Sequence, residues 1–104
     1  MAIFYKTKSE KRAVTLRFEL DDGVTISDIA DYGFSLLSGP ASPAITSSNA
    51  QLSGNDVIVM VDLGATGQTW LLLATVDLST GERVQNSAEL VIDNRAYEGR
   101  IVND

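Results

Sequence analysis

Hydrophobic and polar residues alternate along most of this chain, and no segment shows the sustained spacing of an amphipathic helix. Between Arg12 and Leu20 the sequence R-A-V-T-L-R-F-E-L places apolar and polar side chains on opposite faces. Similar alternation, rich in β-branched residues, recurs over 56–63 (D-V-I-V-M-V-D-L), 69–78 (T-W-L-L-L-A-T-V-D-L) and 83–92. This pattern predicts strands that each bury one face.

The region between these segments is less regular. Asp22-Gly23 marks a turn, and the extended stretch 25–37 has a broken alternation that predicts a bulge or a short helical turn near 28–31. Residues 38–54 carry no charge and contain both prolines of the chain. Because proline donates no ladder hydrogen bond, we expect a loop here, followed by a short edge strand around 44–50.

Strands of this length, separated by short glycine turns, are typical of an antiparallel sandwich or barrel. We expect an all-β domain, a β-sandwich of about six to seven strands over 13–93, with a basic N-terminal arm at 1–12 and a C-terminal tail at 94–104. The predicted core consists of Val14, Leu16, Phe18, Leu20, Phe34, Val57, Val59, Val61, Trp70, Leu72, Ala74, Val76, Leu90 and Ile92.

Two of the predicted strands also carry apolar residues on the opposite face. Alternation that points Trp70 into the core turns Leu71 and Leu73 outward. On the preceding strand the same logic turns Ile58 and Met60 outward. Outward apolar residues on central strands favour burial against another subunit. The alternative is that the C-terminal tail or the proline-containing loop folds over them.

Charge is distributed unevenly along the 104 residues. The net charge is −6, with five basic residues and one acid in 1–17 (+4) against three basic residues and thirteen acids in 18–104 (−10). An acidic body disfavours binding to nucleic acid, and no apolar run is long enough to span a membrane. The basic arm is suited to an acidic neighbour such as a second copy, or is a solvated, frayed terminus.

The residue types present limit the possible chemistry. With no cysteine and no histidine, disulfides, thiolate metal sites and Ser/His/Asp arrangements are excluded. Two carboxylate pairs exist, Asp21 with Asp22 and Asp28 with Asp31, but they lie at predicted turns and form no calcium-loop motif. The glycine-rich segment 64–68 joins two strands and does not open a helix, so it is no phosphate loop. We expect no enzymatic activity, no cofactor and no metal.

The second half of the chain carries a recognisable series of motifs. A Ser53-Gly54 lead-in precedes an alternating valine strand, a G-x-x-G-x-T turn at 64–69, a strand that begins T-W, and a short T-G-E-R hairpin at 80–83. Residues 21–27 (D-D-G-V-T-I-S) add a motif ahead of the second strand. With these motifs the chain resembles, over residues 14–93, the small structural proteins of tailed bacteriophages known as fibre–tail adaptors.

The resemblance implies an immunoglobulin-like fold and a non-catalytic structural role in a phage virion, in the tail or neck. It implies other virion proteins as partners, a homo-oligomer or ring, and a location in particles made in the host cytoplasm. Alternatives are a capsid decoration protein or a generic immunoglobulin-like module that binds carbohydrate or protein. From the arm and the outward apolar positions we expect an interface that contains Phe4, Tyr5, Lys6, Lys8, Lys11, Arg12, Ile58, Met60, Leu71 and Leu73.

Overall fold

The computed structural model describes residues 2–94, and within that range it contains eight strands and no helix. The strands are β1 (Ala2–Lys6), β2 (Arg12–Arg17), β3 (Ile26–Ser38), β4 (Ile45–Ser47), β5 (Gln51–Ser53), β6 (Asp56–Leu63), β7 (Thr69–Leu78) and β8 (Arg83–Ile92). The last three coincide with the predicted strands, because each is a long alternating run between glycine turns.

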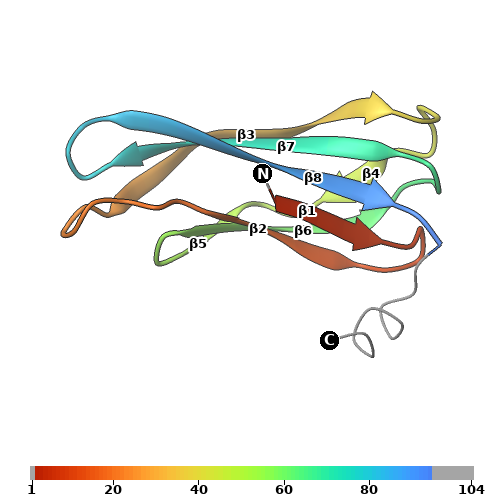
Figure 1. Ribbon diagram of the computed structural model, residues 1–104, viewed down its shortest axis with the longest axis horizontal. Coiled ribbons are helices and arrows are strands. Elements are labelled where there is room, and N and C mark those ends of the chain that lie inside the picture. The colour runs from red at the N-terminus through yellow and green to blue at the C-terminus, as the bar shows by residue number, and fades with distance from the viewer. Residues whose placement is uncertain (1, 95–104) are drawn as a thin grey trace.

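The strands form two sheets that pack face to face as a β-sandwich (Figure 1). The larger sheet has the order β1-β8-β7-β3. In the smaller sheet β2 pairs with one edge of β6, while β4 and β5 pair with successive parts of its other edge. The predicted single edge strand around 44–50 is therefore two short strands.

The strand order within the sheets is similar to that of a constant-type immunoglobulin sandwich, which places strands A, B, E and D in one sheet and C, F and G in the other. Here β2, β6 and β4/β5 correspond to B, E and D, and β3, β7 and β8 to C, F and G, whereas β1 lies in the sheet opposite to that of strand A. The β-sandwich prediction is confirmed, with eight strands in place of six or seven.

The one departure from an all-antiparallel sandwich lies at the N-terminus. Strand β1 pairs in parallel with β8, its Phe4 opposite Leu90 and its Lys6 opposite Ile92. A parallel pair needs a long connection, and the whole intervening domain supplies it. Residues 2–6, predicted as part of a separate basic arm, therefore form an edge strand of the larger sheet.

The core lies between the sheets and follows the predicted register. Every predicted core residue is buried except Leu20 and Phe34, which are half-buried against the core. On β7, Trp70 is 8% exposed, whereas Leu73 on the opposite face is 42% exposed. The irregular third strand contains the expected bulges, with register shifts between Ile26 and Asp28 and between Ile29 and Asp31.

A buried glutamine ties together the loops at one end of the sandwich. Gln68 is fully buried, and its Nε2 donates hydrogen bonds to the carbonyl oxygens of Pro40 (2.8 Å) and Pro43 (2.9 Å). Its Oε1 accepts from the backbone N–H of Ala65 (2.8 Å) and from Trp70 Nε1 (3.0 Å). All the hydrogen-bonding positions of this side chain are thus used, which fixes the proline-containing loop away from the outer face of the larger sheet.

Candidate interaction surface

The apolar residues predicted to face outward do so, but on opposite sides of the molecule. Leu71 and Leu73 belong to β7 in the larger sheet, and they alternate with core residues. Ile58 and Met60 belong to β6 in the smaller sheet. A single flat partner cannot contact both pairs, so the structure separates the predicted interface into two surfaces.

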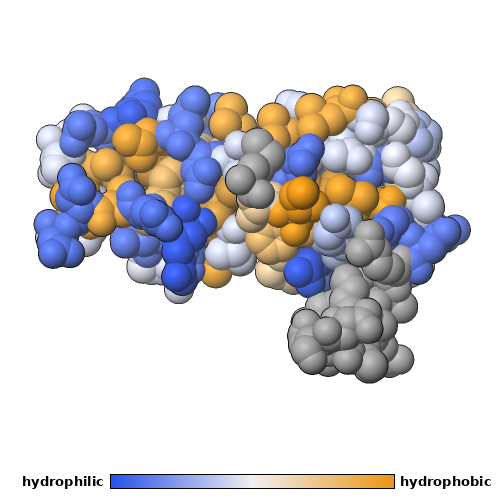
Figure 2. All heavy atoms as spheres, in the orientation of Figure 1, coloured by the Kyte–Doolittle hydropathy of each residue, from blue (hydrophilic) through white to orange (hydrophobic). Residues whose placement is uncertain are grey.

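The outer face of the larger sheet gathers further apolar residues around Leu71 and Leu73. Ile3 lies across β8 from Leu71, and on the same face Tyr5 pairs with Val91. Ile3 is 49% exposed. Figure 2 views the molecule from the side of β1 and shows hydrophobic residues over this strand, with others along the right half of the upper rim, where β3 runs. We call Ile3, Tyr5, Leu71, Leu73 and Val91 the apolar half of the outer face.

Sequence reasoning did not predict that Ile3 and Val91 lie together on this surface. Their neighbours across the sheet are known only once β1 is paired with β8. Alternation within 83–92 places Val91 outward, but Val91 became part of a patch only through its pairing with Tyr5.

One carboxylate lies in the middle of the apolar half. Glu89 sits between Ile3 on β1 and Leu71 on β7. Among the described residues, Glu89 is the one charged side chain in the cross-strand rows that contain Tyr5, Leu71 and Leu73, and it is half-buried. The surface therefore combines exposed hydrophobic area with a central negative charge.

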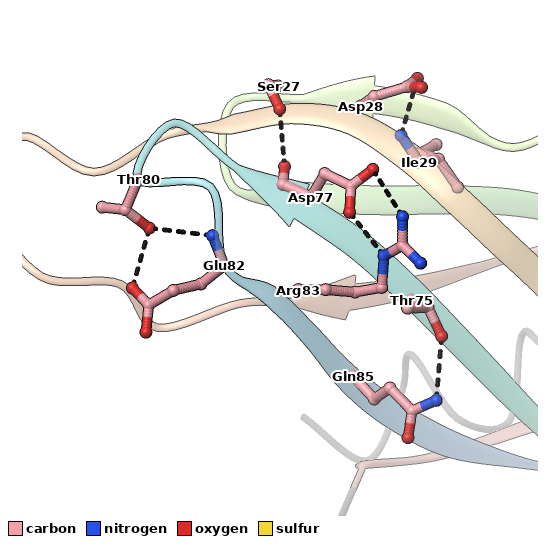
Figure 3. A network of polar contacts seen from close by, with 9 residues as sticks. All are labelled: Ser27, Asp28, Ile29, Thr75, Asp77, Thr80, Glu82, Arg83 and Gln85. Atoms are coloured by element: carbon pink, nitrogen blue, oxygen red, sulfur yellow. Dashed lines mark hydrogen bonds and ion pairs between the residues drawn. The ribbon is translucent and has the colours of Figure 1, made fainter.

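The other half of the same face is polar and internally paired (Figure 3). Arg83 Nε donates to Asp77 Oδ1 at 2.7 Å, and Gln85 Nε2 donates to Thr75 Oγ1 at 3.0 Å. The hydrogen bond from Arg83 lowers the pKa of the Asp77 carboxyl below its usual value. Ser27 on β3 donates to the Asp77 carbonyl oxygen at 3.0 Å. The outer face is thus divided along the strands into an apolar half and a charged half.

On the smaller sheet, Ile58 and Met60 have more polar surroundings. Ile58 pairs with Thr15 on one side and Gln51 on the other, and both Ile58 and Met60 are half-buried. Next to them Arg17 Nε donates to Asp56 Oδ1 at 3.0 Å. This face has less exposed apolar area than the larger sheet.

Two members of the predicted basic arm do not face a partner. Lys6 is fully buried, and its Nζ donates to the carbonyl oxygens of Leu63 (2.6 Å) and Thr7 (2.7 Å). Burial lowers the pKa of Lys6 below its usual value, although nearby Asp62 and Glu10 oppose this shift. Phe4 points into the sandwich opposite Leu90. The prediction that Lys6 and Phe4 contact a partner is corrected, because strand pairing turns both side chains inward.

The remaining basic residues of the predicted arm lie in the turn between β1 and β2 and at the first residue of β2. Lys8 and Lys11 are exposed, and the Arg12 guanidinium lies 5.5 Å from the centre of the Phe4 ring. Of the predicted basic interface, Lys8 and Lys11 therefore have solvent-facing side chains, while Arg12 packs at the seam between the sheets.

A groove at one end of the sandwich offers no converging set of reactive groups. It is open, measures about 540 Å³ and lies between Arg17–Leu20 and Ser53–Asp56. Its Arg17 and Asp56 side chains pair with each other. Within residues 2–94 no three carboxylates, histidines or cysteines lie close enough to hold a metal ion, and no helix is long and apolar enough to cross a membrane.

No protein-family model matches the chain, and a search of curated proteins finds no match for it. The functional argument is therefore based on the surface of the sandwich and on the motifs of its sequence.

Proposed function

We propose that this protein is a non-enzymatic structural protein of a bacteriophage virion, an adaptor in the tail or neck that assembles by contacts with other virion proteins. The observation that supports an assembly role is the apolar half of the outer face. Leu73 is 42% exposed and Ile3 49% exposed on a sheet whose other face already forms the core. An apolar patch on a rigid sheet marks a protein-interaction surface.

The site of assembly within a phage is supported by the motifs at 21–27 and 52–83. The structure gives these motifs a physical role: the G-x-x-G-x-T segment is the turn between β6 and β7, and T-G-E-R is the turn between β7 and β8. The T-G-E-R turn joins the paired strands β7 and β8, whereas the G-x-x-G-x-T segment carries the chain from the smaller sheet to β7, the strand with Leu71 and Leu73. The motifs thus support the rigid sheet on which the proposed contacts lie.

A carbohydrate-binding module has less support. A sugar site needs exposed aromatic rings with converging polar groups. Phe4 and Tyr32 pack against the core, and of the tyrosines in the described part of the chain Tyr5 alone lies on an outer face. The third tyrosine, Tyr97, lies outside the described residues.

The test is deletion of the gene from the phage that encodes it, followed by complementation with the wild-type gene. Purified particles are analysed by quantitative mass spectrometry and electron microscopy. We expect the protein in wild-type particles in a fixed copy number, and a missing or detached tail or neck component in the deletion. Complete, infectious particles that never contain the protein would refute the proposal. Intact tails with unstable heads would support capsid decoration in its place.

A further inference from the structure

The outer face of the larger sheet has a layout that fits a second copy of itself. In the apolar half, Leu73 lies between the small residues Ser87 and Gly33, whereas Leu71 lies between Glu89 and Ser35. In the polar half, Arg83 on β8 lies beside Asp77 on β7. In the row of Leu73 a large side chain thus has small neighbours, and in the row of Arg83 a positive charge has a negative neighbour.

From this layout we infer that the outer faces of two copies bind each other around a two-fold axis that runs along the strands between β7 and β8. A row here is a set of residues that pair across neighbouring strands. Such an axis keeps each row opposite the same row of the partner copy, and it places β8 of one copy over β7 of the other. Leu73 then lies over Ser87 of the second copy, and Arg83 lies over Asp77 of the second copy. No two like charges of these rows face each other.

A two-fold axis across the strands is less favourable. Centred on the apolar half, it would place Glu89 directly over Glu89 of the second copy. Centred anywhere else, it would place apolar rows over the charged rows of the partner copy. Like charges in contact oppose association. The axis along the strands avoids this contact, because it places Glu89 over Leu71 of the second copy and not over a second Glu89.

The size of the face is that of a small interface with modest affinity. Strands β7 and β8 have ten residues each, whereas β1 has five and covers only half of their length. At about 3.3 Å per residue and about 4.8 Å between strands, ten-residue lengths of β3, β7 and β8 together with β1 cover about 550 Å². Two such faces bury at most about 1,100 Å², just below the standard range of about 1,200–2,000 Å² and typical of weaker contacts.

Other segments of the described chain do not occupy this face. The proline-containing loop is held by Gln68 at the end of the sandwich, and β4 and β5 pair with β6 in the smaller sheet. Of the two segments that the sequence suggested as covers for this face, the proline-containing loop is therefore elsewhere. The predicted tail is residues 94–104, of which 95–104 lie outside the described residues, and whether it covers the face is an outcome of the experiment.

The first experiment compares two leucines of similar exposure on different sheets. Leu73 is 42% exposed on the larger sheet, and Leu52 is 40% exposed on the smaller sheet. In sedimentation velocity runs over a range of concentrations, we expect the full-length protein to dimerise. Leu73→Ser should raise the dimer dissociation constant at least tenfold, whereas Leu52→Ser should leave it unchanged; circular dichroism checks that both remain folded.

Three results would overturn the inference. One is a wild-type protein that stays monomeric at its highest soluble concentration. Another is equal weakening of the dimer by Leu73→Ser and Leu52→Ser. The third is a wild-type monomer that dimerises only after deletion of 95–104, because the tail rather than a second copy would then cover the face.

The second experiment tests the axis by exchange of charges. Arg83→Glu makes this part of the face negative, and Asp77→Arg makes it positive. Each variant alone should dissociate, because like charges then face each other across the axis. Mixing the two should give a heterodimer, since the new carboxylate of one chain then faces the new guanidinium of the other, and the native Asp77 faces the native Arg83. A mixture that stays monomeric, or single variants that dimerise like the wild type, would refute this axis.

The inference rests on the proposed function only in taking the outer face as a protein contact, and it adds the identity of the partner. The two can fail separately. A protein found in virions that never dimerises through this face refutes the inference and leaves the proposed function. A dimer that is absent from every particle refutes the proposed function and leaves the inference.

Discussion

Replacing Gln68 with methionine tests whether the buried hub at the end of the sandwich stabilises the fold. Methionine has a similar length and is apolar, so the Gln68→Met variant removes hydrogen bonds without creating a large cavity. Four partners lose their bond: the carbonyl oxygens of Pro40 and Pro43, the N–H of Ala65 and Trp70 Nε1. The two carbonyls belong to exposed residues and can bond to water, whereas Trp70 is 8% exposed.

The cost is therefore dominated by Trp70 Nε1, because Ala65 is only half-buried. A buried donor without a partner costs about 1–3 kcal/mol, and we expect a destabilisation of about this size. Since small domains are stable by about 5–15 kcal/mol, the variant should lose a large part of its free energy of unfolding. Gln85→Met is the control, because Gln85 is exposed and its bond to Thr75 lies on the surface; its change should stay within about 0.5 kcal/mol.

Urea unfolding, followed by the fluorescence of the single tryptophan, measures both variants. The midpoint of Gln68→Met should fall while the slope m stays near the wild-type value, because the same surface is exposed on unfolding. A destabilisation under about 1 kcal/mol, or one equal to that of Gln85→Met, would refute the reasoning that these donors depend on Gln68.

Two further predictions concern a glycine and a lysine. Gly39→Ala should lower the free energy of unfolding by at least about 2 kcal/mol, because φ is +98° and the new Cβ would lie 2.8 Å from Gln68 Cα. Gly33 has open space around it, so Gly33→Ala should change this free energy by less than about 0.5 kcal/mol in the same urea assay. Lys6 should titrate below the usual lysine pKa in an NMR experiment, because burial disfavours its charge. Between the two pKa values the unfolded chain holds a proton that the folded chain has released, so the free energy of unfolding should rise with pH there. Lys6→Met should lack this rise, and an identical pH dependence in both proteins would contradict the assignment.

The amino-acid sequence by itself determined the strands of the second half and the direction of their side chains. Alternation has a period of two residues and depends only on neighbours along the chain, so Trp70 could be placed inside and Leu71 outside before any pairing was known. Glycine turns after Leu63 and Leu78 then ended the strands at the observed residues. These are local properties, and a local pattern is sufficient to predict them.

The candidate surface depended on contacts that only the tertiary structure decides. Residues 2–6 become a strand because β8 offers an edge about 86 positions away along the chain, and this pairing buries Lys6 and brings Ile3 beside the apolar residues of β7. Likewise, alternation turned Ile58 and Leu71 outward alike, but the assignment of their strands to different sheets put them on opposite sides of the molecule. Strand pairing between distant segments is set by the packing of the whole core, so alternation along one segment determines which face of a strand is buried and leaves its neighbours undetermined.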